Sequence, residues 1–121
     1  MWSVVEDFTL AWHPLVARVA LTGTGIGQLR TIGTIDGKQI VERLEVIDDA
    51  KQFYRYTEIA GVPASHYTGT LQVKPNGSGC IVHWRVEFLA SNQPDIVVRT
   101  MVSALLKTGL ASLKLRFAAP R

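Results

Sequence analysis

The feature that most constrains the fold of this chain is a change in the period of its apolar residues near residue 92. From residue 15 to residue 90, apolar and polar residues largely alternate between turn-forming segments, which is typical of β-strands. From residue 92 to residue 117, apolar residues recur every three or four positions, which predicts one long amphipathic helix. Its apolar stripe comprises Val98, Val102, Leu106, Leu110, Leu113 and Phe117. This order predicts an α+β fold in which a curved antiparallel sheet wraps around the C-terminal helix.

About six strand-like segments precede the helix, and Asp36-Gly37 and Asn76-Gly77 are hairpin signals between two pairs of them. A short helix is expected within the first eight residues, where Trp2, Val5 and Phe8 share one side. The sequence has no internal repeat, low-complexity tract or linker-like segment. We therefore predict a single domain spanning residues 1–121, long enough to bury a core without metal or disulfide support.

Composition and spacing argue against several classes of function. The formal net charge is +3 and the basic residues are scattered, so nucleic acid is not an expected partner. The chain does not start like a signal peptide, and no segment reaches the roughly 18 to 20 apolar residues of a membrane span, so we predict a cytoplasmic protein. His13, His66, His83 and Cys80 lack metal-ligand spacing, and no nucleotide fingerprint is present, so neither metal nor cofactor is expected. Cys80, the one cysteine, is expected to be a small core residue.

A carboxylate interrupts an apolar row in the segment QIVERLEVIDD, residues 39 to 49. With a period of two, Glu42 shares its face with Ile40, Leu44 and Val46. Burying an unpaired carboxylate is costly. Glu42 must therefore be partnered, protonated, or facing a cavity that holds water or ligand.

The type of turn before this segment decides which residue lies opposite Glu42. A three-residue turn at Ile35-Asp36-Gly37, with Gly37 in the left-handed conformation, places Arg30 directly across from Glu42. A two-residue turn at Asp36-Gly37 would instead set Arg30 against Arg43, which is electrostatically unfavourable. The charges favour the three-residue turn and an inward Arg30–Glu42 pair.

Alternation assigns the inward rows of two later strands and leaves a third open. One inward row comprises Tyr67, Gly69, Leu71 and Val73, and the other comprises Cys80, Val82, Trp84, Val86 and Phe88. Gly69 marks either a bend in the sheet or room for something to sit there. In QFYRYTEI the inward set is either Phe53, Arg55, Thr57 and Ile59 or Tyr54, Tyr56 and Glu58. Pattern alone does not choose between these two sets.

The order of several motifs resembles a known family. WSVVEDF, WHP, GQLRTI, DGKQIVERL, DDAKQFYRY and VHWRVEF follow one another as in the polyketide cyclase/dehydrase branch of the START-like, or helix-grip, superfamily. The resemblance covers nearly the whole chain. It implies a seven-stranded antiparallel sheet gripping a long C-terminal helix, with an apolar cavity between them.

The resemblance also implies roles for individual residues. Glu42 and Tyr67 match polar residues that reach into the ligand cavity, and Tyr56 matches an aromatic one, so that Tyr54 and Glu58 would also face inward. Arg30 matches a basic position, and Trp84 would line the cavity. The ligand-binding residues expected on this basis are Arg30, Glu42, Tyr56, Glu58, Tyr67, Trp84, Leu106 and Leu110. For Arg30 and Glu42, the alternative is a purely structural ion pair.

Two functions follow from the resemblance. The first is binding of a hydrophobic or aromatic small molecule between the sheet and the C-terminal helix. The second is a polyketide cyclase or dehydratase, in which Arg30 would stabilise an enolate and Glu42 or a tyrosine would transfer a proton. No catalytic residue is assigned. The family's usual first strand is missing, so either the gene start was assigned too late or another chain, such as a homodimer partner, covers the open sheet edge.

Overall fold

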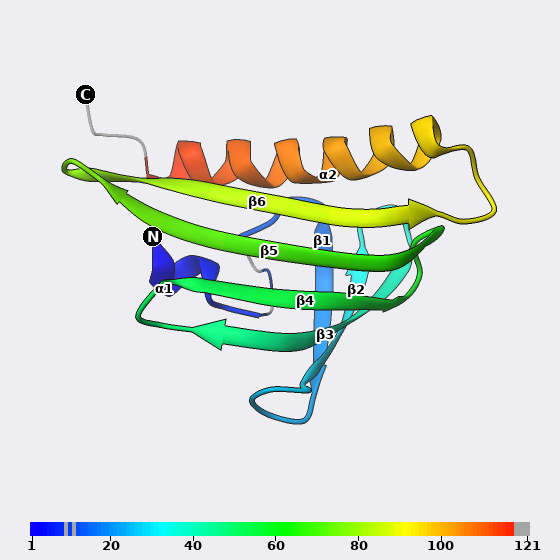
Figure 1. Cartoon of the computed structure of the whole chain (residues 1–121), viewed down its shortest axis with the longest axis horizontal. Helices are drawn as coiled ribbons and strands as arrows, with labels where there is room; N and C mark the ends of the chain where they lie inside the picture. The colour runs from blue at the N-terminus through cyan, green and yellow to red at the C-terminus, as the bar shows by residue number, and fades with distance from the viewer. Residues whose placement is uncertain (9, 11, 118–121) are drawn as a thin grey trace.

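The computed structural model describes residues 1–8, 10 and 12–117, which form one antiparallel sheet and two helices (Figure 1). The sheet has six strands in sequence order, so β1 and β6 are its edges. In chain order the elements are α1 (Trp2–Val5), β1 (Val16–Thr22), β2 (Leu29–Thr34), β3 (Gln39–Asp48), β4 (Phe53–Ala60), β5 (Ala64–Asn76), β6 (Gly79–Ala90) and α2 (Asp95–Arg116). This is the expected α+β, helix-grip plan, with no strand before α1 among the described residues.

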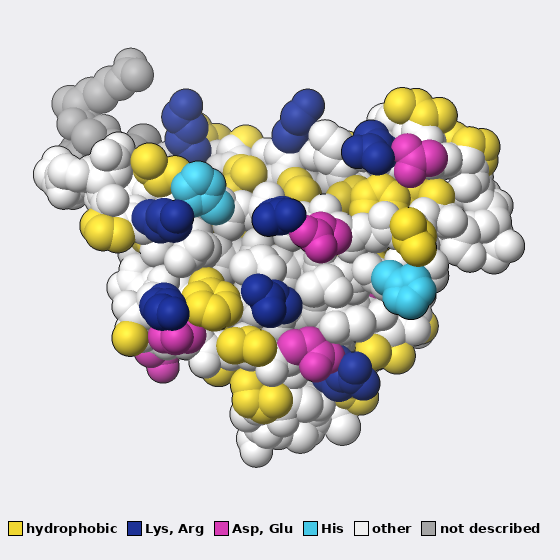
Figure 2. All heavy atoms as spheres, in the orientation of Figure 1, with side chains coloured by type: hydrophobic (Ala, Val, Ile, Leu, Met, Phe, Trp, Pro, Cys, Tyr) yellow, Lys and Arg dark blue, Asp and Glu magenta, His cyan; other side chains and the backbone are white. Residues whose placement is uncertain are grey.

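The sheet is strongly twisted, and α2 lies along β6 (Figure 1). The strands β1 and β2 run across the direction of β4, β5 and β6 in this view. By length and composition alone, helix α2 is long and apolar enough to cross a membrane. The core helix of a helix-grip fold meets the same criteria, so this is weak evidence for a membrane span. On the face shown in Figure 2, basic and acidic side chains are interspersed with apolar ones.

The turn between β2 and β3 has the three-residue form that the charges favoured. The Thr34 N–H donates to the Lys38 carbonyl at 2.9 Å, and Gly37 has a φ of 85°. Arg30 consequently lies opposite Glu42 in the β2–β3 register. The expected alignment of these two residues is confirmed.

One inward row ends earlier than the alternation predicts. The β3–β4 register shifts between Leu44 and Val46, so that β3 carries an extra residue, Glu45, at this point. Leu44 is buried but Val46 is 36% exposed. The expectation that Val46 joins the inward row was wrong, because an inserted residue moves every later side chain to the opposite face.

The later strands follow the predicted alternation in most positions. Tyr54 and Tyr56 are buried while Arg55 is exposed, which settles the face that the pattern of β4 left open. Tyr67 and Leu71 are buried on β5, as expected. Cys80 is exposed, against the expectation of a core residue, because it pairs with Pro75 beside the β5–β6 turn.

Helix α2 buries its predicted stripe most fully on either side of the middle, and leaves its last residue exposed. Val98, Val102 and Leu113 are buried, and Leu106 and Leu110 are partly buried. Phe117 is 43% exposed because it caps the helix after its last turn. Pro94 is the N-cap of this helix.

Candidate functional site

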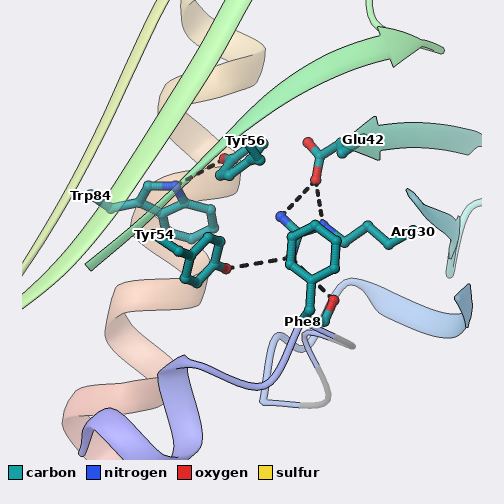
Figure 3. Close-up of polar contacts among 6 residues, drawn as sticks. All are labelled: Phe8, Arg30, Glu42, Tyr54, Tyr56 and Trp84. Atoms are coloured by element: carbon teal, nitrogen blue, oxygen red, sulfur yellow. Dashed lines mark hydrogen bonds and ion pairs between the residues drawn. The ribbon is translucent and has the colours of Figure 1, made fainter. Parts of the chain in front are cut away.

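Arg30 is fully buried on β2, next to the edge strand β1, and makes polar contacts with Glu42, Phe8 and Tyr54 (Figure 3). Its Nε–H donates to Glu42 Oε1 at 2.7 Å, and Nη2 lies 2.7 Å from the same oxygen. Its Nη1 donates to the Phe8 carbonyl at 3.2 Å and to the Tyr54 hydroxyl at 3.4 Å. Glu42, which is 6% exposed, is therefore the paired carboxylate that its apolar row required.

Aromatic rings complete the surroundings of the guanidinium. The Arg30 Cζ lies 4.1 Å from the centroid of the Phe8 ring, 4.7 Å from that of Tyr56 and 5.7 Å from that of Tyr54. Such cation–π contacts strengthen when the cation is desolvated. We call Phe8, Arg30, Glu42, Tyr54, Tyr56 and Trp84 the core cluster (Figure 3).

The charge states in the core cluster follow from burial and from the ion pair. Burial alone lowers the pKa of Arg30, but the attraction of Glu42 and the two tyrosines raises that pKa above its usual value. Burial raises the pKa of Tyr56 well above its usual value, and the negative charge of Glu42 raises it further. Arg30 is therefore a cation and Tyr56 a neutral phenol at neutral pH.

Gly69 is the position that makes room for Tyr56. A Cβ built at Gly69 would collide with Cζ, Oη and Cε1 of the Tyr56 ring. The Trp84 Nε1–H donates to the Tyr56 hydroxyl at 3.0 Å and helps hold the ring in this position. The space left by Gly69, which could have held a ligand, is thus occupied by a side chain of the protein.

His13 ties the segment after α1 to the middle of α2. Its Nδ1 accepts the Leu15 N–H at 3.1 Å, so its protonated Nε2 donates to the Leu105 carbonyl at 2.9 Å. A Cβ at Gly109 would lie 2.6 Å from His13 Cδ2 and 2.8 Å from Trp84 Cζ3. Gly109 therefore lets α2 approach both rings, which is the packing reason for a glycine within this helix.

An apolar pocket of about 670 Å³ lies between the β2–β3 turn, the β4–β5 connection and the first half of α2. We call it the mouth pocket. It is lined mainly by Leu15, Ile35, Ile40, Val62, Pro63, Val97, Met101, Ala104 and Leu105, with Tyr67 among its walls. Thr34, Asp36, Lys38 and Gln93 also border it, and mostly apolar walls with a few polar groups are typical of sites for small molecules.

Tyr67 lines this pocket, and Glu58 lies beside it through its bond to Val62 without being one of the lining residues. Glu58 is partly buried, and one of its oxygens accepts the N–H of Val62, a mouth-pocket residue, at 3.1 Å. Tyr67 is 2% exposed and lines the pocket. Burial raises the pKa of Tyr67 above its usual value, with smaller contributions from the charges of Glu42 and Glu58.

A second, larger hollow of about 1220 Å³ lies at the other end of α2. It is bounded by α1, the β5–β6 hairpin and the C-terminal part of α2, with Trp2, Val73, Val82 and Leu113 in its walls. Leu110 faces this hollow and not the mouth pocket. The core cluster lies in the walls of neither hollow.

The residues expected at the site thus fall into separate groups. Arg30, Glu42, Tyr56 and Trp84 meet in the core cluster, Glu58 and Tyr67 lie toward the mouth pocket, and Leu106 and Leu110 lie on α2. Sequence reasoning missed Phe8 as a contact of Arg30, because no local signal links a loop residue to a strand. It also gave no sign that Met101, which packs against the core, lines the mouth pocket.

Comparison with known proteins agrees with this architecture. Similar solved structures include XoxI from Bacillus cereus, with a TM-score of 0.89 and 27% identity over 96% of this chain and 84% of that one. Norcoclaurine synthase from Thalictrum flavum has a TM-score of 0.73 at 18% identity, covering 98% of this chain and 78% of that one. A structure of the same synthase in complex with dopamine and hydroxybenzaldehyde has a TM-score of 0.64 at 16% identity, covering 88% of this chain and 69% of that one. No curated protein matches the chain.

The six-stranded grip around α2, with a buried polar cluster and flanking hollows, defines a helix-grip protein of the START-like class. A family model described as "Polyketide cyclase / dehydrase and lipid transport" matches residues 1–118. The chain belongs to that family.

Proposed function

We propose that the protein binds a small hydrophobic or aromatic molecule in the mouth pocket. The observation that carries the proposal is an apolar hollow of about 670 Å³ whose wall includes the hydroxyl-bearing Tyr67. Ligand sites of this size combine apolar walls with a few polar groups that fix orientation. The family description includes lipid transport, and a structure with the same fold holds dopamine and hydroxybenzaldehyde, two small aromatic molecules. We also propose that the protein acts in the cytoplasm.

The geometry favours binding over cyclisation. An arginine that stabilises an enolate must reach the substrate with a free N–H. Arg30 is instead directed at Glu42, Phe8 and Tyr54. Its Nη2 forms no hydrogen bond within the described part of the chain, but it is buried beside Glu42, and Arg30 lines neither hollow. We therefore assign Arg30 and Glu42 to the support of the site and not to proton transfer in it.

The test is a matched pair of substitutions on α2. Ala104 lines the mouth pocket and Ala111 does not, and both are exposed alanines of the same helix. We expect Ala104→Trp to fill the pocket and weaken the binding of 2-naphthylmethanol at least tenfold, while Ala111→Trp leaves it within twofold. Affinity is measured by NMR titration of ¹⁵N-labelled protein. Equal binding by both variants would place the ligand elsewhere, and the proposal would be wrong.

A further inference from the structure

Two carboxylates lie directly opposite each other on the inner face of the sheet. Glu42 and Glu58 are register partners on β3 and β4. Glu42 shares its face with buried Leu44, and Glu58 shares its face with buried Tyr54 and Tyr56. Like charges in this arrangement repel each other. Burial raises the pKa of Glu58, and the charge of Glu42 raises it further.

A single buried cation in the described part of the chain, Arg30, lies beside this pair of carboxylates, and it is paired with Glu42. Among the described residues, Arg30 forms the only ion pair made by either glutamate, and both of its contacts are to Glu42 Oε1. The Glu42 Oε2 atom points away from the guanidinium (Figure 3). Counting Arg30, Glu42 and Glu58 at neutral pH leaves one negative charge without a cation.

Tyr67 adds a polar group that the protein leaves open. Its side chain is 2% exposed and lines the mouth pocket. Its hydroxyl forms no hydrogen bond within the part of the chain that the structure describes, and its pKa responds to the charges of both Glu42 and Glu58. The fully buried polar side-chain atoms without a partner among the described residues are Trp12 Nε1 and Arg30 Nη2, so the Tyr67 hydroxyl is open to the pocket that Tyr67 lines. A ligand in the pocket would therefore reach it.

The charges at the rim of the pocket do not offset this imbalance. Asp36 and Lys38 lie in the β2–β3 turn, where their side chains approach to 3.8 Å. Both are largely exposed, so they cancel each other in solvent. The pocket therefore offers an anionic ligand no free buried cation among the described residues.

We propose that the ligand of the mouth pocket carries a protonated amine on an apolar or aromatic body. The amine donates to the Glu58 carboxylate and to the Tyr67 hydroxyl, and its charge supplies the cation that the two glutamates lack. The body fills the apolar walls formed by Val62, Val97 and Met101. This inference rests on the proposed function, since it names the chemical class of the ligand for the same pocket.

The experiment compares three probes of nearly the same shape and different charge. They are 2-naphthylmethylamine, 2-naphthylmethanol and 2-naphthoate, titrated by NMR at pH 7. A hydrogen bond to a charged group contributes more binding free energy than one between neutral groups. We therefore expect the amine to bind at least about tenfold more tightly than the alcohol. We expect 2-naphthoate to bind more weakly than either.

A matched pair of glutamate substitutions assigns the preference to Glu58. We expect Glu58→Gln to weaken the amine about tenfold and to change the alcohol less than twofold, because a glutamine oxygen still accepts the Val62 N–H. The control is Glu87→Gln on the outer face of β6, where Glu87 pairs with Arg85 in solvent. It should change neither affinity.

The outcomes separate the two proposals. If the alcohol binds in the pocket and Ala104→Trp blocks it, but the amine has no advantage, the amine inference is wrong and the binding function stands. Equal loss of amine and alcohol affinity in Glu58→Gln also overturns the amine inference. If no probe binds, both proposals are wrong.

Discussion

The core cluster and the mouth pocket lie on the inner side of one sheet and differ in whether their polar groups bond to other residues of the protein. In the core cluster, Arg30 and Tyr56 each bond to side chains of the protein and occupy the available space. In the mouth pocket, the Tyr67 hydroxyl borders a hollow and has no partner among the described residues. Tyr56 on β4 is therefore a structural residue, whereas Tyr67 on the neighbouring strand β5 is a candidate ligand contact. Substitutions in the core cluster should cost stability, and those at the mouth should cost binding.

Removing Arg30 should have the largest effect. Arg30→Ala leaves Glu42 buried without its cation, which typically lowers the free energy of unfolding by about 3–5 kcal/mol. Denaturation in urea measures this loss. The control is the double variant Arg30→Met with Glu42→Leu, which removes both charges and should recover most of the stability. A single variant as stable as the parent would show that the cluster is not the structural centre of the fold.

Gly69→Ala should have the next largest effect. The added methyl group meets the Tyr56 ring and forces it away from Trp84, and overpacking of this kind typically costs about 1–3 kcal/mol. Gly79→Ala on β6 is the matched control, because a Cβ there meets only the Asn76 carbonyl oxygen at 3.8 Å. Thermal unfolding of both variants compares them. Similar melting temperatures would mean that the Tyr56 ring moves freely, contrary to our interpretation.

A pair of tyrosine substitutions compares the two regions directly. Tyr56→Phe removes the acceptor of the Trp84 Nε1–H and should lower the free energy of unfolding by about 0.5–1.5 kcal/mol. Tyr67→Phe removes a hydroxyl that has no partner among the described residues, so we expect its effect on stability to be smaller than about 0.5 kcal/mol. Binding of 2-naphthylmethylamine should show the reverse order. The comparison between the regions fails if Tyr67→Phe costs more stability than Tyr56→Phe.

The smallest expected effects are on the pH dependence of stability, and they have opposite signs for His13, which packs against Trp84 of the core cluster, and for Glu58, which lies beside the mouth pocket. Burial lowers the pKa of His13, so its contribution to stability is present above the usual value near 6.5 and is lost as the pH falls through the lowered pKa. Burial raises the pKa of Glu58, so its cost to stability is absent below the usual value of 4.5 and grows as the pH rises through the raised pKa. Each contribution should be about 1 kcal/mol or less.

Two single variants separate these pH effects. The stability difference between the parent and His13→Gln should increase in the parent's favour from pH 5 to pH 7.5, and that between the parent and Glu58→Gln should change in the opposite direction. Urea denaturation at a series of pH values measures both. The same sign for both variants would contradict the assignment of these groups.

Much of the fold could be predicted because the signals for it are local. The change of period near residue 92 defined the helix, and the charges of Arg30, Arg43 and Glu42 selected the three-residue turn. The bulge at Glu45 could not be predicted, since nothing in the alternating sequence of β3 marks an inserted residue. The position of Val46 was wrong for that reason.

The candidate site was less predictable because a sequence does not show whether the space beside a small residue is filled by another side chain or left as a cavity. Gly69 and Tyr56 could each be read as signs of a cavity, yet the ring of Tyr56 fills the space beside Gly69. The mouth pocket is formed by residues far apart in the chain, such as Ile35, Val62 and Met101, and alternation says nothing of the distance between them. The ligand-binding roles of Glu58 and Tyr67 stay predictions until the titrations are made.

The hydrogen bonds between the segment after α1 and α2 have a consequence for the order of events during synthesis. His13 bonds to Leu105 and the Ser112 hydroxyl bonds to Trp12, each across more than ninety residues of sequence. The sheet, in contrast, pairs every strand with its neighbour in the chain, and such hairpins can form as soon as two strands have left the ribosome. The inner face of the sheet then stays uncovered until α2, in the last quarter of the chain, has been synthesised and packs against it. A nascent chain paused before residue 105 should therefore expose this apolar face to chaperones.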